Sequence, residues 1–174
     1  MKALYTLIAF ALSISCYAQS TLINNVTIHT ATGTVIENGA VGFKNGKIDF
    51  VGAANTANGT YDQRIDGGKG HLYPGIIAPN STLGLIEIDA VRATRDAEET
   101  GEYNPNARAI IAYNAESEVS PTVVSNGVLM AQITPRGGRI SGTSTVVNLR
   151  AWNWEDAAYK LDEGIHLNWP MPYE

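Results

Sequence analysis

Cysteine is almost absent from this sequence: the 174 residues contain one, Cys16. That residue lies near the N-terminus, in a segment that we expect to be removed, so the mature chain would have no cysteine. Disulfides therefore cannot stabilise the fold, even in an oxidising compartment. We expect stability to come from packing instead.

Long apolar runs are missing after the first residues. The apolar run at 3–14 follows Lys2 and is shorter than the roughly 20 residues that a membrane-spanning helix needs. With small residues at positions 16 and 18, it is typical of a secretory signal peptide. We therefore predict a signal peptide over residues 1–18, no transmembrane segment, and export to the periplasm or the medium. A lipoprotein acylated at Cys16 is the alternative, which Ser13 disfavours because leucine is usual there.

An excess of positive charge is also absent. The chain has 12 basic and 17 acidic residues, and loss of Lys2 with the leader would leave 11 against 17. An acidic chain is poorly suited to a phosphate backbone. We expect no nucleic-acid partner.

Short strands and tight turns dominate the part of the chain before Pro74. Apolar and polar residues alternate from Leu22 to Ile28, as in a strand with one covered face. Asn45-Gly46 is a strong hairpin signal between two further strands. Strands are predicted at Leu22–Ile28, Ala40–Phe43, Ile48–Val51, Gln63–Asp66 and Leu72–Tyr73. Together they predict a small β-sandwich over residues 19–73.

After Pro74 the pattern changes. Ile76–Ala78 is apolar without alternation, as in a parallel strand buried on both faces, and Gly127–Thr134 is a second such candidate. A further strand is predicted at Thr145–Leu149. One helix is predicted from a cap at Asn106 through Ala112, with Ile110 and Ile111 on its apolar face. Another is predicted over Trp154–Leu161.

One segment carries a family resemblance. Ile65–Thr82 reads IDGGKGHLYPGIIAPNST, and it resembles the motif that opens the catalytic barrel of the amidohydrolase superfamily, in which an aspartate and a His-x-His pair follow Pro-Gly. Together with the turn at Asn45–Ile48, it is similar to the start of imidazolonepropionase-like metal-dependent hydrolases. The histidine positions fall on Asn80 and Thr82, and the aspartate position falls on Ala78.

The resemblance implies an α/β fold with a β-rich start: a small β-sandwich followed by the first strands and helices of an incomplete TIM-type (β/α)8 barrel. Residues 74–174 would be a partial metal-dependent hydrolase barrel. In that family, Zn²⁺ or another divalent metal activates water for hydrolysis of carbon–nitrogen bonds other than peptide bonds. An amide and a hydroxyl do not replace two imidazoles. We therefore assign no catalytic residue, no metal ligand and no cofactor to this chain alone.

The barrel of the family extends well beyond this sequence, which covers two or three of its eight strands. We expect the chain to be inactive alone. Parallel strands left open would expose backbone groups and apolar side chains, so the possible partners are a second polypeptide or another copy that completes the barrel. The alternative function is a non-catalytic binding or assembly module that completes or scaffolds a partner chain.

Four residues are candidates for a surviving pocket: Asn80, Thr82, Glu87 and Arg139. Asn80 and Thr82 end a predicted barrel strand, where sites are built, although ordinary strand-end residues would look the same. Glu87 could share a strand face with Asp89 as a carboxylate pair. The alternative is a solvated loop in which nearby arginines compensate the charge.

Arg139 lies in a glycine-rich segment, Gly137–Ser144, which we interpret as a mobile loop near the barrel mouth. The segment resembles a phosphate loop but has Thr143 where the lysine belongs, so nucleotide binding is not expected. The three histidines are far apart in sequence. His29, His71 and His166 are each interpreted as a surface or satisfied histidine rather than a metal ligand.

Overall fold

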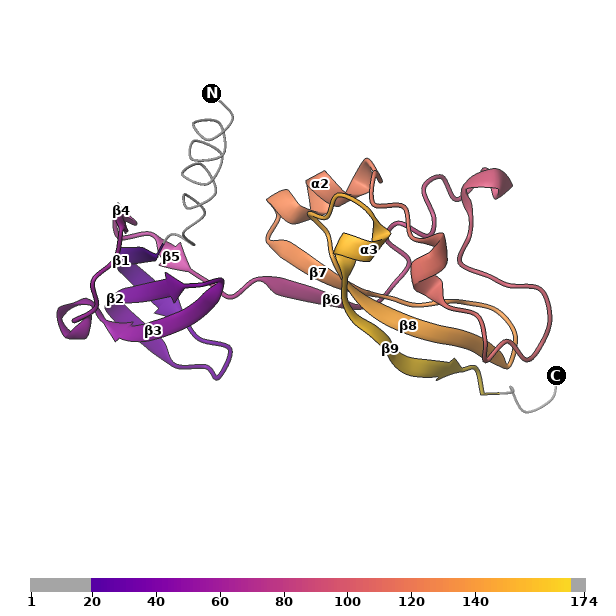
Figure 1. Cartoon of the computed structure of the whole chain (residues 1–174), viewed down its shortest axis with the longest axis horizontal. Coiled ribbons are helices and arrows are strands. Elements are labelled where there is room, and N and C mark those ends of the chain that lie inside the picture. The colour runs from indigo at the N-terminus through magenta and orange to yellow at the C-terminus, as the bar shows by residue number, and fades with distance from the viewer. Residues whose placement is uncertain (1–19, 170–174) are drawn as a thin grey trace, which may run out of the picture. The chain divides into compact units, whose positions relative to one another are not determined.

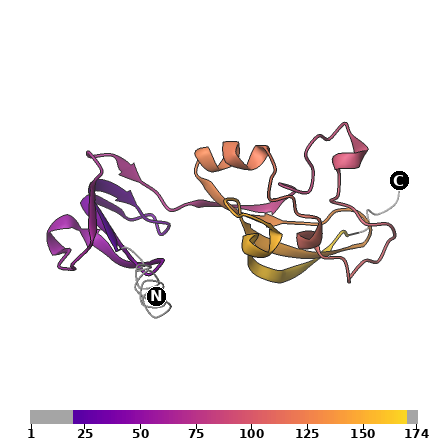
Figure 2. The same cartoon turned by 45° about the horizontal axis from the view of Figure 1, so that its top comes forward.

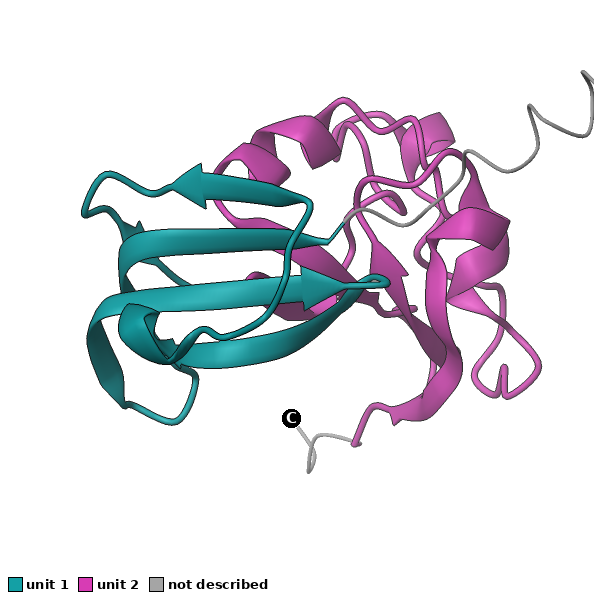
Figure 3. Ribbon diagram, turned by 60° about the vertical axis from the view of Figure 1, so that its left-hand side comes forward, with its two compact units in different colours: residues 1–74 teal, residues 75–174 magenta. Residues whose placement is uncertain are grey.

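The computed structural model describes residues 20–169, which form two compact units that divide between Pro74 and Gly75 (Figure 3). The predicted signal peptide at residues 1–18 lies outside the described residues. Within them, no helix is both long and apolar enough to cross a bilayer. Each unit is built around its own β-sheet.

The first unit contains five strands: β1 (Thr21–His29), β2 (Val35–Lys44), β3 (Lys47–Ala53), β4 (Gln63–Asp66) and β5 (His71–Leu72), with a 3₁₀ turn at Ala54–Thr56 (Figure 1). The order is β3-β2-β1-β4, and β5 also pairs with β1. The predicted hairpin at Asn45-Gly46 is confirmed, with both residues at positive φ as a two-residue turn of type I′ requires. The predicted sandwich is not formed within residues 20–74, because all five strands belong to one sheet.

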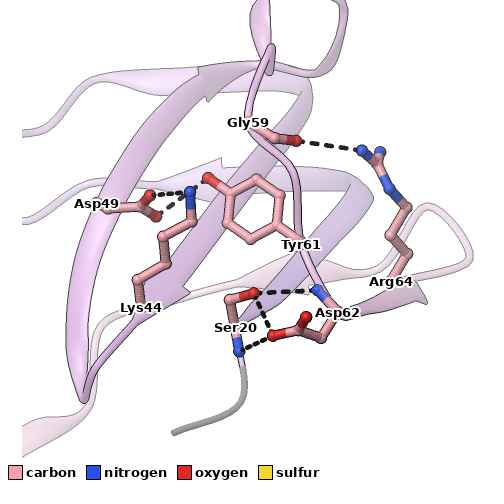
Figure 4. A network of polar contacts seen from close by, with 7 residues as sticks. All are labelled: Ser20, Lys44, Asp49, Gly59, Tyr61, Asp62 and Arg64. Carbon is pink, nitrogen blue, oxygen red and sulfur yellow. Dashed lines mark hydrogen bonds and ion pairs between the residues drawn. The ribbon is translucent and has the colours of Figure 1, made fainter. Parts of the chain in front are cut away.

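Tyr61 covers one face of this sheet, above Leu22 and Ala40. Its ring lies over Gly42, where a Cβ would be 2.2 Å from the Tyr61 hydroxyl oxygen. The hydroxyl donates to Asp49 Oδ1 at 3.1 Å, as Figure 4 shows. Burial, together with this bond to a carboxylate, raises the pKa of Tyr61. Glycine at position 42 therefore allows a loop residue to close this face.

A cluster of polar contacts lies near the start of β1. The Ser20 hydroxyl donates to Asp62 Oδ2 at 2.7 Å and accepts from the Asp62 backbone N–H at 3.0 Å, and Arg64 donates to the Gly59 carbonyl (Figure 4). The Ser20 backbone N–H also donates to Asp62 Oδ2, at 3.0 Å, and this bond together with that of the Ser20 hydroxyl lowers the pKa of Asp62. On the other side of the sheet, Val26, Ile28 and Val41 form a separate apolar cluster.

The second unit contains a four-stranded mixed sheet in the order β6-β7-β8-β9. Its strands are β6 (Ile76–Ser81), β7 (Val128–Ile133), β8 (Ile140–Asn148) and β9 (Ala158–Leu167). The pair β6–β7 is parallel, as expected of barrel strands, whereas β7–β8 and β8–β9 are antiparallel. The helices are short: α2 (Val119–Ser125), α3 (Trp154–Ala157), and 3₁₀ turns at Arg92–Thr94 and Ala109–Ala112. Figure 2 shows α2 beside β7.

The core of this unit lies on one face of the sheet. Ala131 and Ile133 of β7 and Val147 of β8 are fully buried there, because these alternate residues share a face across the paired strands. Loop residues, among them Leu85 and Ile110, complete the cluster. The long connection between β6 and β7 therefore acts as the cover of this face.

The structure corrects the expectation for the first barrel strand. Ile76–Ala78 does form a strand, but the side chains of Ile76 and Ile77 are both 55% exposed. The reason is that β6 is an edge strand of the sheet of the second unit. Within residues 20–169, no strand pairs with its outer edge and no element packs on its second face.

Both helix predictions were too long. Asn106 caps nothing, since the helical segment is a four-residue 3₁₀ turn that begins at Ala109 without a side-chain cap. The segment Trp154–Leu161 is helical only to Ala157, with Asn153 Oδ1 accepting the Asp156 N–H at 2.8 Å, and then continues as β9. Pairing with β8 overrides the weak helical preference of these residues.

The glycine-rich segment is also more ordered than predicted. From Ile140 onward it is part of β8, and Ser141 and Ser144 are buried. The Gly137-Gly138 pair forms the turn before the strand, with both residues at positive φ. Small side chains are needed because β8 is enclosed by two strands and a loop.

Candidate functional site

Asn80 lies one residue before the end of β6, in the left-handed region at φ 50°. Asparagine tolerates this region better than most residues. The register of β6 against β7 is interrupted between Ala78 and Ser81, and the Asn80 N–H turns to the side chain of Gln132, whose Oε1 accepts it at 3.1 Å. The Asn80 backbone is thus held by a side chain at a break in the sheet ladder, and the pairing resumes at Ser81.

Arg136 holds both oxygens of Asn80. Its Nη1 donates to Asn80 Oδ1 at 2.6 Å, and its Nη2 donates to the Asn80 carbonyl at 2.8 Å. The Arg136 backbone is itself anchored, because its N–H donates to the Ala97 carbonyl at 2.6 Å. A guanidinium is permanently charged and presents its donors in a rigid fork, so a positive charge is fixed against the strand end.

Gln132 connects this strand end to the far side of the sheet. Its neighbours Ala131 and Ile133 face the core, so the Gln132 side chain points to the opposite face. Its Nε2 donates to Glu163 Oε2 at 2.5 Å and lies 3.5 Å from Ser144 Oγ. One amide therefore bridges β6 and β9 across the two strands between them.

His166 of β9 belongs to the same region. Burial and the positive charge of Arg136 lower the pKa of His166, while Glu163 opposes the shift. Burial and the Arg136 charge both favour the neutral form of the imidazole. We call the set Asn80, Gln132, Arg136, Glu163 and His166 the strand-end network.

The strand-end network does not fit a divalent metal centre. The oxygens of Asn80, which the resemblance expects at a histidine position, already accept from Arg136. A second cation beside the guanidinium would be repelled, and amide and hydroxyl groups are weak ligands for a zinc-like ion. Among residues 20–169, no group of three or more histidine, cysteine, aspartate or glutamate side chains could hold a metal.

The other predicted site residues make no hydrogen bond or ion pair to Asn80 within the described residues. The Thr82 carbonyl accepts from Leu85 and Ile86 in a turn. Glu87 accepts from Asn114 Nδ2 at 3.2 Å and Ser117 Oγ at 2.9 Å. The side chain of Arg139 is 54% exposed, and its Nε lies 4.0 Å from Glu102 Oε2.

The carboxylate pair suggested for Glu87 and Asp89 is not formed. The segment is a bend and turn rather than a strand, so the two side chains do not share a strand face. Asp89 instead lies 3.6 Å from Arg95, and its side chain is almost fully exposed. The alternative of a solvated loop with compensating arginines describes this segment better.

Gln132, Arg136 and Glu163 were missed by the sequence analysis. One signal was available for Gln132, since it is the polar residue inside the apolar run Gly127–Thr134. Arg136 and Glu163 gave none, because their partners are 56 and 31 residues away in the chain. Contacts over such separations depend on strand order and register.

Replacing Arg136 with methionine tests the network. Loss of two charge-assisted hydrogen bonds should lower the free energy of unfolding by about 1–3 kcal/mol. Removal of the positive charge should also raise the pKa of His166 toward its ordinary value, which NMR titration would measure. Arg139→Met is the control: its exposed side chain should contribute less than about 0.5 kcal/mol and should leave His166 unchanged. Equal effects of the two variants would contradict the assignment.

Comparison with known proteins gives a likeness in structure but none in sequence. No model of a protein family matches the sequence, and no curated protein matches it. The structure is similar to the crystal structure of an amidohydrolase from Thermotoga maritima MSB8, with a TM-score of 0.75 and 24% sequence identity. The match covers 84% of this chain and 38% of the other. The two proteins share a fold over that region, and this chain spans well under half the length of the amidohydrolase.

Proposed function

We propose that this chain is an exported amidohydrolase-like protein: a hydrolase by type, for carbon–nitrogen bonds other than peptide bonds, that does not turn over substrate alone. The likeness to the Thermotoga amidohydrolase supports the general type. The observation that carries the second part is the Arg136 guanidinium on both oxygens of Asn80, at the strand end where the resembling family places its first metal ligands.

The chemistry of the strand-end network supports inactivity alone. The network contains two amides, an arginine, a carboxylate and an imidazole, and none of these groups acts on water as the Lewis acid that a bound divalent cation is. Hydrolysis would then require ligands and a base from another polypeptide, whose own strands would extend the sheet past β6 or β9.

A non-catalytic binding or assembly module is the second candidate, and the edge strand β9 favours it. Tyr159, Ile165 and Leu167 are exposed along this strand, as is Ile77 on the opposite edge. Apolar side chains beside unpaired strand backbone form a surface to which another strand can add. The partner would be a second polypeptide or a second copy of the chain.

Turnover measurements separate the two candidates. The mature chain, beginning at Gln19, would be assayed against cyclic amides and imides with Zn²⁺ or Mn²⁺, alone and together with the polypeptide encoded next to it. We expect no turnover alone. Activity that arises only on mixing would support the hydrolase proposal, and a stable complex without activity would favour the assembly module. Turnover by the chain alone would contradict both.

A further inference from the structure

Two histidines that are 42 residues apart meet at the edge of the first sheet. His29 ends β1 and His71 begins β5, and these strands pair in parallel with Thr27 opposite His71. Alternate residues of paired strands share a face, so His29 and His71 project from the same side of the sheet. Their ring nitrogens face each other, with His29 Nε2 2.8 Å from His71 Nδ1.

Tyr73 holds one ring of the pair in place. Its ring stacks on His29 with centroids 4.3 Å apart and planes 8° from parallel. Tyr73 itself is 62% exposed, and His71 is also exposed. The pair is therefore oriented by stacking but open to ions from solvent.

A divalent metal can take the place of the shared proton between the two rings. Zinc–nitrogen bonds of about 2.0–2.1 Å in tetrahedral geometry separate two ligand nitrogens by about 3.3 Å. The present distance needs to increase by only about 0.5 Å, which small rotations of two surface side chains supply. We propose that His29 and His71 form a two-imidazole site for a divalent transition metal of the zinc, nickel and copper class.

The remaining ligands of such a site would be water. No third histidine, cysteine or acidic side chain joins the pair among the described residues. A site with two protein ligands is open and exchangeable, unlike the closed four-ligand sites that hold structural zinc. The site consists only of residues of the first unit, so metal binding there is independent of any hydrolase activity of the chain.

Titration calorimetry with Zn²⁺, Ni²⁺ and Cu²⁺ on the mature chain, prepared without an affinity tag, tests the site. We expect one ion per chain, with Cu²⁺ bound most tightly as the general order of divalent-metal affinities requires. His29→Gln and His71→Gln should each weaken binding about tenfold or more. Glutamine fits an exposed position, and an unchanged circular dichroism spectrum would show that each variant folds.

His166→Gln is the matched control, because it removes the third histidine from a different sheet. It should leave the affinity unchanged. Absence of saturable binding, or binding that both His29→Gln and His71→Gln retain, would overturn the proposal. As a second readout, Zn²⁺ should shift the NMR signals of the His29 and His71 rings while leaving those of His166 in place.

Discussion

Alanine at Gly142 is expected to destabilise the second unit by about 3 kcal/mol or more. Gly142 adopts φ +128°, which L-residues with a side chain rarely adopt. An added Cβ would also lie 2.6 Å from the carbonyl oxygen of Ala107. That oxygen cannot retreat freely, because it accepts the Thr143 N–H at 2.8 Å. Urea-induced unfolding would measure the loss.

Two other glycines distinguish backbone strain from a steric clash of the added Cβ. Gly127 has φ +89° and open space where a Cβ would be, so Gly127→Ala carries backbone strain alone and should lose about 1 kcal/mol. Gly164 has an ordinary φ, and its nearest atom would be 3.9 Å from the new Cβ, so Gly164→Ala should be near neutral. If Gly142→Ala lost no more stability than Gly127→Ala, the close approach of the Ala107 loop to β8 would be wrong.

Alanine at Ile110 should give the second large effect, a loss of about 2–5 kcal/mol as for other buried isoleucines. Ile110 is fully buried in the core of the second unit, although it lies in a 3₁₀ turn of four residues. Its contacts with the sheet residues of that core make the loop between β6 and β7 part of the folded structure. Thermal or urea unfolding would quantify the loss.

Ile111 is the matched control, one residue further along the same turn. It is 63% exposed, so Ile111→Ala should change the free energy of unfolding by less than about 0.5 kcal/mol. The predicted amphipathic helix placed both isoleucines on one apolar face, whereas the structure buries one and exposes the other. Similar losses for the two variants would favour the helix.

Local signals explain why the first sheet was largely predictable. The Asn45-Gly46 turn and the alternation from Leu22 to Ile28 depend on residues next to each other. β1 and β3 lie where these signals place them, whereas β2 begins at Val35, before the predicted start at Ala40. The pairing of the strands could not be predicted, because no local pattern indicates that β4 and β5 both pair with β1. One sheet therefore formed where two layers were predicted.

In the second sheet, tertiary pairing decided what local preference could not. The apolar runs at Ile76 and Val128 gave the parallel strands β6 and β7. The residues after Trp154 favour a helix weakly, yet β9 pairs with β8 over most of its length. Gly142 reads as a loop residue in the sequence, but its positive φ accommodates an irregularity within a strand.

One member of the strand-end network was proposed from the sequence as a pocket residue. Asn80 was singled out because the resemblance places it at a histidine position at the end of a strand, and in the structure it bonds to Arg136 and Gln132. Its partners come from β7, the turn after β7, and β9, so they depend on register. The same reason hid the His29–His71 pair, whose members meet only through the parallel pairing of β1 and β5.

Metal analysis tests whether the strand-end network binds a divalent metal. Elemental analysis for Zn, Mn and Fe would be run on the mature chain carrying His29→Gln and His71→Gln, so that the site proposed on the first sheet does not contribute. We expect metal well below one ion per chain after dialysis against the free ions. One tightly bound ion per chain, lost on Asn80→Ala with Thr82→Ala, would contradict it.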